Sequence, residues 1–151
     1  MADGGAHGHL THRGVVYPWD CDHMGHMNVR MYVHHFDQAL YVLLAEVGLG
    51  REYLKERERR LAGVDQHVQY KRELFPGDVF QIRSRFTQLG RTSLTISHRM
   101  ESLAGELIAT CDVVGVHLDA RSGRPAELPE DVRTRISESR EGVAGGPPHG
   151  D

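Results

Sequence analysis

Five ionisable side chains crowd into the nine residues from Asp20 to Asn28. The segment precedes a stretch whose apolar residues recur with the spacing of one helical face, and Asn28 is a suitable N-cap for that helix. A helix N-terminus carries unpaired backbone N–H groups and the positive end of the helix dipole. Such groups can stabilise a developing oxyanion, and a nearby carboxylate can act as a base or a nucleophile. Asp20, Asp22 and the N–H of about Val29 therefore have the parts for acyl transfer, although aspartate is also common in turns and caps.

Two other chemistries could use residues of this region. His23 and His26 have a ligand-like spacing, but a zinc site needs three or four ligands that converge with tetrahedral geometry. His34 and His35 are adjacent on the expected helix and therefore point about 100° apart. Carboxylates on both sides of Cys21 would raise the pKa of its thiol and disfavour the nucleophilic thiolate. We therefore expect neither a functional metal nor a cysteine nucleophile.

The pattern of apolar residues predicts one long helix and five strands. The helix begins near Asn28, keeps its apolar residues on one face and ends at Gly48. Short helices are expected over 51–60 and 131–139. Strands are predicted at 14–17, 62–70, 80–86, 94–100 and 107–118. Because the last four strands follow one another through short turns, we expect an antiparallel sheet with one helix on its face, an α+β arrangement.

Length and composition indicate one small soluble domain. The chain has 151 residues, 39% of them hydrophobic, which is enough for a single core. A net charge of -3 without a block of Lys or Arg disfavours nucleic acid as the main partner. The longest apolar run, Ala39 to Ala45, is too short to cross a bilayer, and the start lacks the features of a secretory signal. With two cysteines, the composition favours a reducing, cytoplasmic compartment. Residues 13–139 are expected to form the domain, between disordered tails at 1–12 and 140–151.

The segment from Tyr17 to Tyr32 resembles the signature of the hotdog-fold acyl-CoA thioesterases of the 4-hydroxybenzoyl-CoA thioesterase type. It fits the pattern D-x-D-x-x-G-H-x-N-x-x-x-Y and is followed by Phe36-Asp37-Gln38-Ala39. Two further segments, 68–78 and 89–94, are similar to that family at the expected distances. The resemblance implies a hotdog fold, in which a long helix packs on a five-stranded antiparallel sheet.

The resemblance also implies a role for each matching residue. Asp22, the second aspartate of the pair, would be the catalytic carboxylate, and the backbone N–H of Val29 would bind the thioester oxygen. Gly25 would let the backbone approach the thioester, while His26 and Asn28 would shape the loop and cap the helix. The substrate-binding residues would be Tyr32, in the helical turn that could line the tunnel, and Arg91, Thr92 and Ser93, in a turn that faces the phosphates of coenzyme A.

The expected function is hydrolysis of an acyl-CoA to the free acid and coenzyme A, with Asp22 as general base or as nucleophile. No cofactor is needed, because a carboxylate, water and oriented N–H groups suffice. Two alternatives remain open: a thioesterase acting on acyl carrier protein, and a non-catalytic module that binds acyl-CoA. A single sheet with one long helix leaves exposed edges, so we expect a homodimer or homotetramer with its active site between protomers, and no membrane partner.

Overall fold

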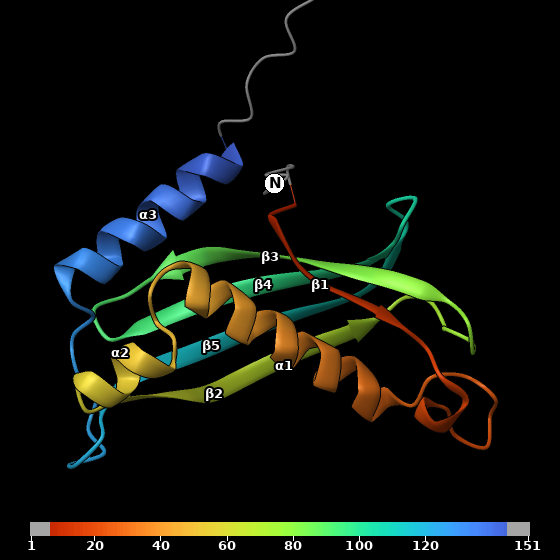
Figure 1. Cartoon of the computed structure of the whole chain (residues 1–151), viewed down its shortest axis with the longest axis horizontal. Helices are drawn as coiled ribbons and strands as arrows, with labels where there is room; N and C mark the ends of the chain where they lie inside the picture. The colour runs from red at the N-terminus through yellow and green to blue at the C-terminus, as the bar shows by residue number, and fades with distance from the viewer. Residues whose placement is uncertain (1–6, 145–151) are drawn as a thin grey trace, which may run out of the picture.

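The computed structural model describes residues 7–144, which form one α+β domain (Figure 1). Its elements, in chain order, are β1 (His9–Val15), the 3-10 turn η1 (Pro18–Asp20), α1 (Val29–Glu46), α2 (Arg51–Glu56), β2 (Arg59–Tyr70), β3 (Val79–Leu89), β4 (Ser93–Ser102), β5 (Leu107–Asp119) and α3 (Glu130–Ala144).

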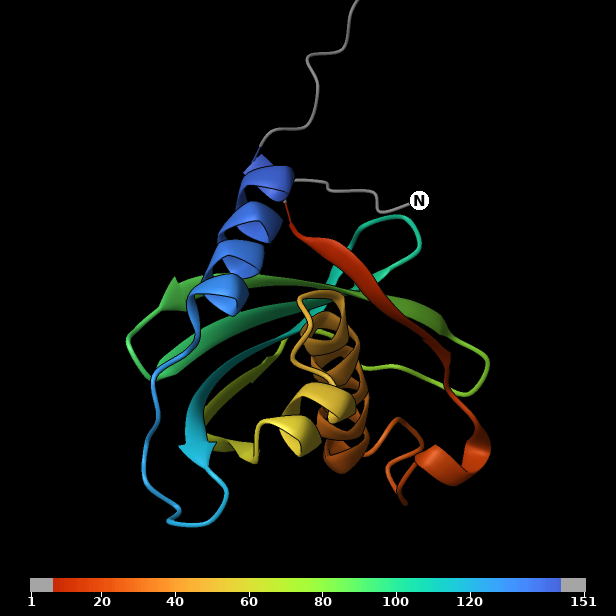
Figure 2. The same cartoon turned by 60° about the vertical axis from the view of Figure 1, so that its left-hand side comes forward.

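The five strands form one antiparallel sheet in the order β1-β3-β4-β5-β2. The long helix α1 crosses one face of this sheet (Figure 1). Figure 2 shows α1 in the hollow of the twisted sheet, with α3 standing beside it near β3. This architecture confirms the predicted hotdog fold.

Helix α1 forms because its sequence combines a cap with an apolar face. The Asn28 side chain accepts the N–H of Arg30 and so caps the first turn. Phe36 belongs to a core cluster with Ile82 of β3 and other strand residues, and burial of one such side chain stabilises the fold by about 1.5–3 kcal/mol. The buried residues of the helix are Tyr32, His35, Phe36, Ala39, Leu43 and Leu44. The predicted helix is therefore confirmed together with its sheet-facing side.

Strand β1 begins at His9, so residues 9–12 lie in the sheet, although the sequence places them in a disordered tail. The physical reason is pairing with a distant strand. Thr11 Oγ1 donates to the carbonyl of Ile82 over 3.2 Å and lies 2.7 Å from Ser84 Oγ. The glycine and histidine composition of the segment does not reveal this partner. The remaining parts of the predicted tails, residues 1–6 and 145–151, lie outside the described residues.

Two helices also end at other residues than predicted. Helix α2 ends at Glu56 instead of residue 60, because Glu58 has a φ of 50° and the chain then enters β2 at Arg59. Helix α3 runs to Ala144, beyond the predicted end at residue 139. Its residues Val132 and Ile136 complete a second core cluster beside the end of α1.

Within residues 7–144, no helix is long and apolar enough to span a membrane.

Candidate active site

The loop between η1 and α1 is closed by its own backbone hydrogen bonds. The N–H of Asp22 donates to the carbonyl of His26 over 3.2 Å, and the N–H of Gly25 donates back to the carbonyl of Asp22 over 3.0 Å. The N–H of Met27 donates to the carbonyl of Leu74 over 2.7 Å. The loop is therefore a compact turn that is attached to the connection between β2 and β3.

Asp20 is a structural residue of this turn. Its carboxylate is buried and accepts the N–H of Tyr17 over 2.9 Å, while its carbonyl accepts the N–H of Asn28 over 2.9 Å. Both polar ends of the residue are thus used to hold the chain on either side of the loop.

The carboxylate of Asp22 is half-exposed and accepts two hydrogen bonds. Oδ1 accepts the N–H of Met24 over 2.9 Å, and Oδ2 accepts Nδ2 of Asn28 over 3.1 Å. The Met24 hydrogen bond, together with smaller effects from Asn28 and nearby histidines, holds the pKa of the Asp22 carboxyl below its usual range. The carboxylate is therefore ionised at neutral pH, as a base or a nucleophile requires.

The start of α1 provides a backbone donor next to this carboxylate. Asn28 Oδ1 accepts the N–H of Arg30 over 3.0 Å, and the carbonyl of Asn28 accepts the N–H of Met31 over 2.9 Å. Between residues 7 and 144, no hydrogen bond uses the N–H of Val29, the first residue of α1. This N–H lies at the positive end of the helix dipole, where it can bind a carbonyl oxygen or an oxyanion.

Gly25 and His26 complete the loop. Gly25 has a φ of +86°, a left-handed conformation that favours glycine, and a Cβ added there would meet no atom within 4 Å. His26 Nε2 lies 3.6 Å from a carboxylate oxygen of Glu73, so the histidine links the loop to the β2–β3 connection. Sequence reasoning missed Glu73 and Leu74 as supports of the loop, although the similarity over 68–78 pointed to that segment.

The structure separates the remaining predicted site residues. Tyr32 is buried in the first turns of α1, its hydroxyl donates to the carbonyl of Arg72 over 3.2 Å, and burial raises its pKa. Arg91 is exposed and pairs with Glu127 over 2.8 Å. Arg91, Thr92 and Ser93 follow the end of β3, an 11-residue strand about 33 Å long whose start lies near the Asp22 loop. Within one chain, the predicted coenzyme A residues are therefore remote from Asp22.

Residues 16–136 match the sequence profile of the thioesterase-like superfamily. The chain belongs to this superfamily. The match spans the Asp22 loop, α1 and the four consecutive strands β2 to β5. No curated protein sequence matches this thioesterase-like protein.

Several solved structures share the fold. A hypothetical protein from Staphylococcus aureus, solved in complex with CoA, has a TM-score of 0.83 and 22% identity over 89% of this chain and 86% of that one. The 1,4-dihydroxy-2-naphthoyl-CoA thioesterase from Synechocystis has a TM-score of 0.76 and 18% identity over 85% and 96%. The probable thioesterase YbaW from Escherichia coli has a TM-score of 0.75 and 17% identity over 87% and 99%. The thioesterase-like protein is similar to each of them in its hotdog fold.

Proposed function

We propose that this thioesterase-like protein hydrolyses an acyl-CoA to the free carboxylic acid and coenzyme A. One observation carries the proposal: the side chain of Asn28 hydrogen-bonds the Asp22 carboxylate and also caps the helix that begins with the Val29 N–H. The same residue, Asn28, thus positions both the proposed nucleophile or base and the start of the helix that carries the proposed oxyanion donor.

In the proposed reaction, the thioester oxygen accepts the N–H of Val29. Asp22 then acts in one of two ways. It removes a proton from water, whose oxygen attacks the carbonyl carbon, or it attacks that carbon itself and forms a mixed anhydride that water hydrolyses. In both routes the C–S bond breaks, coenzyme A leaves as the thiolate and takes up a proton, and the acyl group leaves as the carboxylic acid.

Coenzyme A is the proposed carrier because the similar structures point to it. The Staphylococcus aureus protein is in complex with CoA, and the Synechocystis protein is an acyl-CoA thioesterase. These likenesses support CoA over acyl carrier protein as the thiol half of the substrate. Hydrolysis of acyl carrier protein thioesters alone would instead favour the carrier protein.

We further propose a homodimer in which two β2 edges pair around a twofold axis. Twofold pairing of like strands is antiparallel, so the Asp22 end of one sheet would lie at the same end of the dimer as the partner's β3–β4 turn. Such an arrangement would allow Arg91 of one protomer to approach the coenzyme A phosphates of a substrate bound at Asp22 of the other.

The substitution Asp22→Asn tests the proposed reaction. It keeps the size of the side chain but removes its negative charge, so kcat should fall by about 10²–10⁴-fold in a thiol-release assay with a panel of acyl-CoA substrates. Asp20→Asn is the matched control, because an amide oxygen can still accept the Tyr17 N–H. Its activity should stay near that of the native protein. Full activity in both variants would rule out the carboxylate mechanism, and loss in Asp20→Asn alone would show that the other aspartate reacts.

A further inference from the structure

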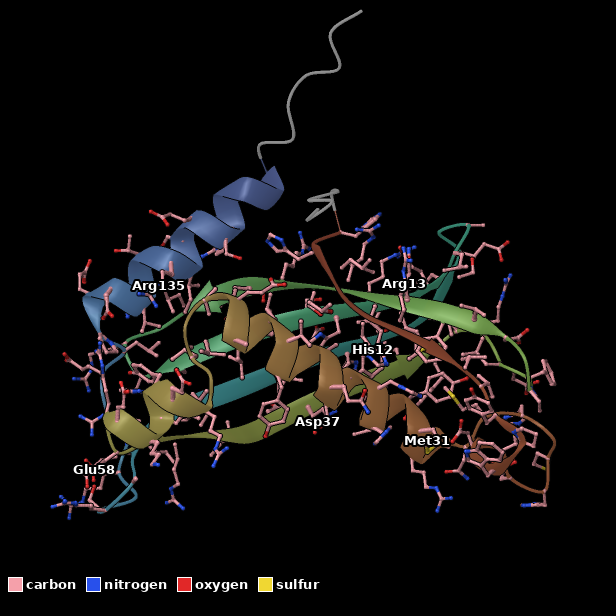
Figure 3. All side chains as sticks on the ribbon, viewed as in Figure 1. His12, Arg13, Met31, Asp37, Glu58 and Arg135 are labelled. Atoms are coloured by element: carbon pink, nitrogen blue, oxygen red, sulfur yellow. The ribbon has the colours of Figure 1, made fainter. Side chains whose placement is uncertain are left out.

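A groove of about 580 Å³ runs between α1, α2 and β2. It begins at Arg30 and Val33 in the first turns of α1, and its lining reaches Leu44 near the end of that helix. Fourteen residues of helix separate Arg30 from Leu44, which is about 21 Å along the axis. Asp37, labelled in Figure 3, lies on the side of α1 that faces β2 and lines the groove. The groove therefore starts within one helical turn of the Val29 N–H and extends along α1 for about 21 Å.

Polar and apolar lining residues are segregated in this groove. Its buried side chains are all apolar and come from α1, the α1–α2 connection, β4 and β5: Phe36, Leu44, Leu49, Leu94, Ile96 and Val113. Its polar side chains all belong to exposed residues: Arg30, His34, Asp37, Tyr41, Arg51 and Gln66, of which Gln66 reaches inward and donates to Sγ of the buried Cys111 over 3.4 Å. A hydrocarbon in the groove would bury apolar surface, whereas a ring hydroxyl among the buried apolar side chains would lose its water without gaining a hydrogen bond from them.

Two glycines facing each other form a notch in the floor of the groove. Gly63 of β2 pairs directly with Gly115 of β5, and both line the groove. A Cβ at Gly63 would meet no atom within 4 Å, so the space above this residue is open. A Cβ at Gly115 would lie 3.5 Å from Cδ1 of Leu94, an ordinary contact. Neither glycine has a positive φ, so the backbone conformation does not require glycine at these two positions. The absence of side chains instead widens the groove.

Resting on the thioesterase function proposed above, we propose that the substrates are thioesters of long, unsubstituted aliphatic acids. The acyl chain lies in this groove and passes over the Gly63–Gly115 notch, which sets the accepted chain length. This substrate class differs from the hydroxylated aromatic acyl group of the Synechocystis enzyme.

The test compares butanoyl-CoA, palmitoyl-CoA and 4-hydroxybenzoyl-CoA as substrates of the native protein and of Gly63→Leu. The native protein should prefer palmitoyl-CoA over the aromatic thioester by about tenfold or more in kcat/KM. The added side chain in Gly63→Leu should reduce kcat/KM for palmitoyl-CoA by about tenfold or more, while kcat/KM for butanoyl-CoA should change by less than about twofold. Gln69→Leu is the control, because it adds the same side chain to the same strand on the face away from α1. Its chain-length profile should equal that of the native protein.

Three outcomes would overturn the inference. The first is an equal loss of kcat/KM for palmitoyl-CoA and butanoyl-CoA in Gly63→Leu. The second is a chain-length profile of Gly63→Leu that equals that of the native protein. The third is a preference of the native protein for the aromatic thioester. If Asp22-dependent hydrolysis persists in these cases, the proposed thioesterase function stands and only the substrate class fails. If no thioester is hydrolysed in an Asp22-dependent way, the function itself fails. Should Gly63→Leu not fold, Gly115→Ala provides the same test with a smaller added group.

Discussion

Asn28 joins the proposed carboxylate to the proposed oxyanion donor, because one amide group serves both. Its Nδ2 donates to Asp22 Oδ2 over 3.1 Å, and its Oδ1 accepts the N–H of Arg30 over 3.0 Å. The position of the carboxylate therefore depends on the position of the helix start. Asn28 is a positioning residue in this scheme.

The substitution Asn28→Asp separates the two tasks of the side chain. Aspartate caps a helix about as well as asparagine, so the melting temperature should change little. It cannot donate to Asp22, and its negative charge should raise the pKa of the Asp22 carboxyl, which is lowered in the native protein. We expect a fall in kcat of about tenfold or more and an acid limb of the kcat/KM–pH profile that moves to higher pH. An unchanged acid limb would show that Asn28 acts only as a cap.

The residues of the loop could be predicted because their contacts are local. Asp22, Asn28 and Val29 lie within eight positions of one another, and the capping role of Asn28 follows from residue type and the helical pattern that comes after it. The distance between Arg91 and Asp22 could not be predicted in this way. It depends on the length of β3 and on the end of the sheet at which each turn lies.

At the scale of elements, the sheet face opposite α1 carries a buried acidic residue between two arginines. Arg83 of β3 and Arg99 of β4 are directly opposite in the strand register. The two oxygens of Glu101 accept Nε of Arg83 and Nε of Arg99, each over 3.0 Å, and Gln81 Nε2 donates over 2.8 Å. Burial alone would raise the pKa of the Glu101 carboxyl, but the hydrogen bonds from Gln81, Arg99 and Arg83 outweigh it and keep the pKa below its usual range. Glu101 thus allows two like charges to face each other across β3 and β4.

Glu101→Gln should destabilise the protein by about 3 kcal/mol or more, because the buried carboxylate that accepts hydrogen bonds from both Arg83 and Arg99 is replaced by a neutral amide. Urea unfolding at neutral pH measures the change. Glu106→Gln is the control, since Glu106 also pairs with an arginine, Arg72, but both side chains are exposed. Its effect should be much smaller, because exposed ion pairs contribute little to stability. Equal effects of the two substitutions would show that burial does not strengthen the Glu101 network.

The strands that sequence patterns predicted best are those with alternating apolar residues and nearby partners. Strands β3 and β4 are joined by a tight turn, and Phe80, Ile82, Ile96 and Met100 on them are buried as expected. Residues 9–12 of β1 escaped prediction because their partner on β3 is about 70 positions away in the sequence. A pattern with few apolar residues gives no local signal for such pairing.

At the scale of the whole molecule, a chain of hydrogen bonds through the core determines which ring nitrogen of His98 carries the hydrogen. Thr11 Oγ1 donates to the carbonyl of Ile82, so Ser84 donates to Thr11 over 2.7 Å. Because Ser84 has used its own hydroxyl hydrogen in that bond, its Oγ acts as the acceptor in the 2.6 Å contact with His98, and Nδ1–H of His98 is the donor. His98 is therefore the Nδ1–H tautomer, and its buried Nε2 is an acceptor without a hydrogen-bond partner in the described part of the chain.

This arrangement predicts acid sensitivity. Burial lowers the pKa of His98 to about 4, and burial, with His12 and His34 nearby, lowers the pKa of His35 to about 4. Between pH 6.5 and 4 the unfolded chain binds protons that the folded protein excludes, so the free energy of unfolding falls as the pH falls. Each histidine should contribute a loss of about 2 kcal/mol between pH 7 and pH 5.

Urea unfolding at pH 7 and pH 5 measures this loss. The drop should be about 2 kcal/mol smaller in His98→Gln than in the native protein, because the amide does not titrate. His67→Gln, an exposed position on β2, should keep the native drop. An identical drop in His98→Gln and the native protein would contradict the assignment of this pH dependence to His98.

The proposed homodimer makes a prediction for the open edge of β2. Val64 lies on this edge strand and is 59% exposed, and Tyr41 and Val42 of α1 are exposed as well. Light scattering at micromolar concentration should give at least the mass of a dimer. Val64→Glu should shift the mass toward the monomer and reduce activity, whereas Leu103→Glu, at an equally exposed apolar site in the β4–β5 turn, should do neither. A native protein that hydrolyses the substrate while its mass is that of a monomer would exclude the dimer.

The edge position of β1 affects how the molecule opens under thermal motion. Strand β1 pairs with β3 alone, and the segment that follows it continues into η1 and the Asp22 loop. If β1 separates from β3, the pairing of β3, β4, β5 and β2 can persist, but the loop loses its anchor to the sheet on one side. Local opening of this kind has a lower free energy than global unfolding. The proposed site therefore belongs to a less stable cooperative unit than the four-stranded remainder, and inactivation on heating should precede loss of the fold.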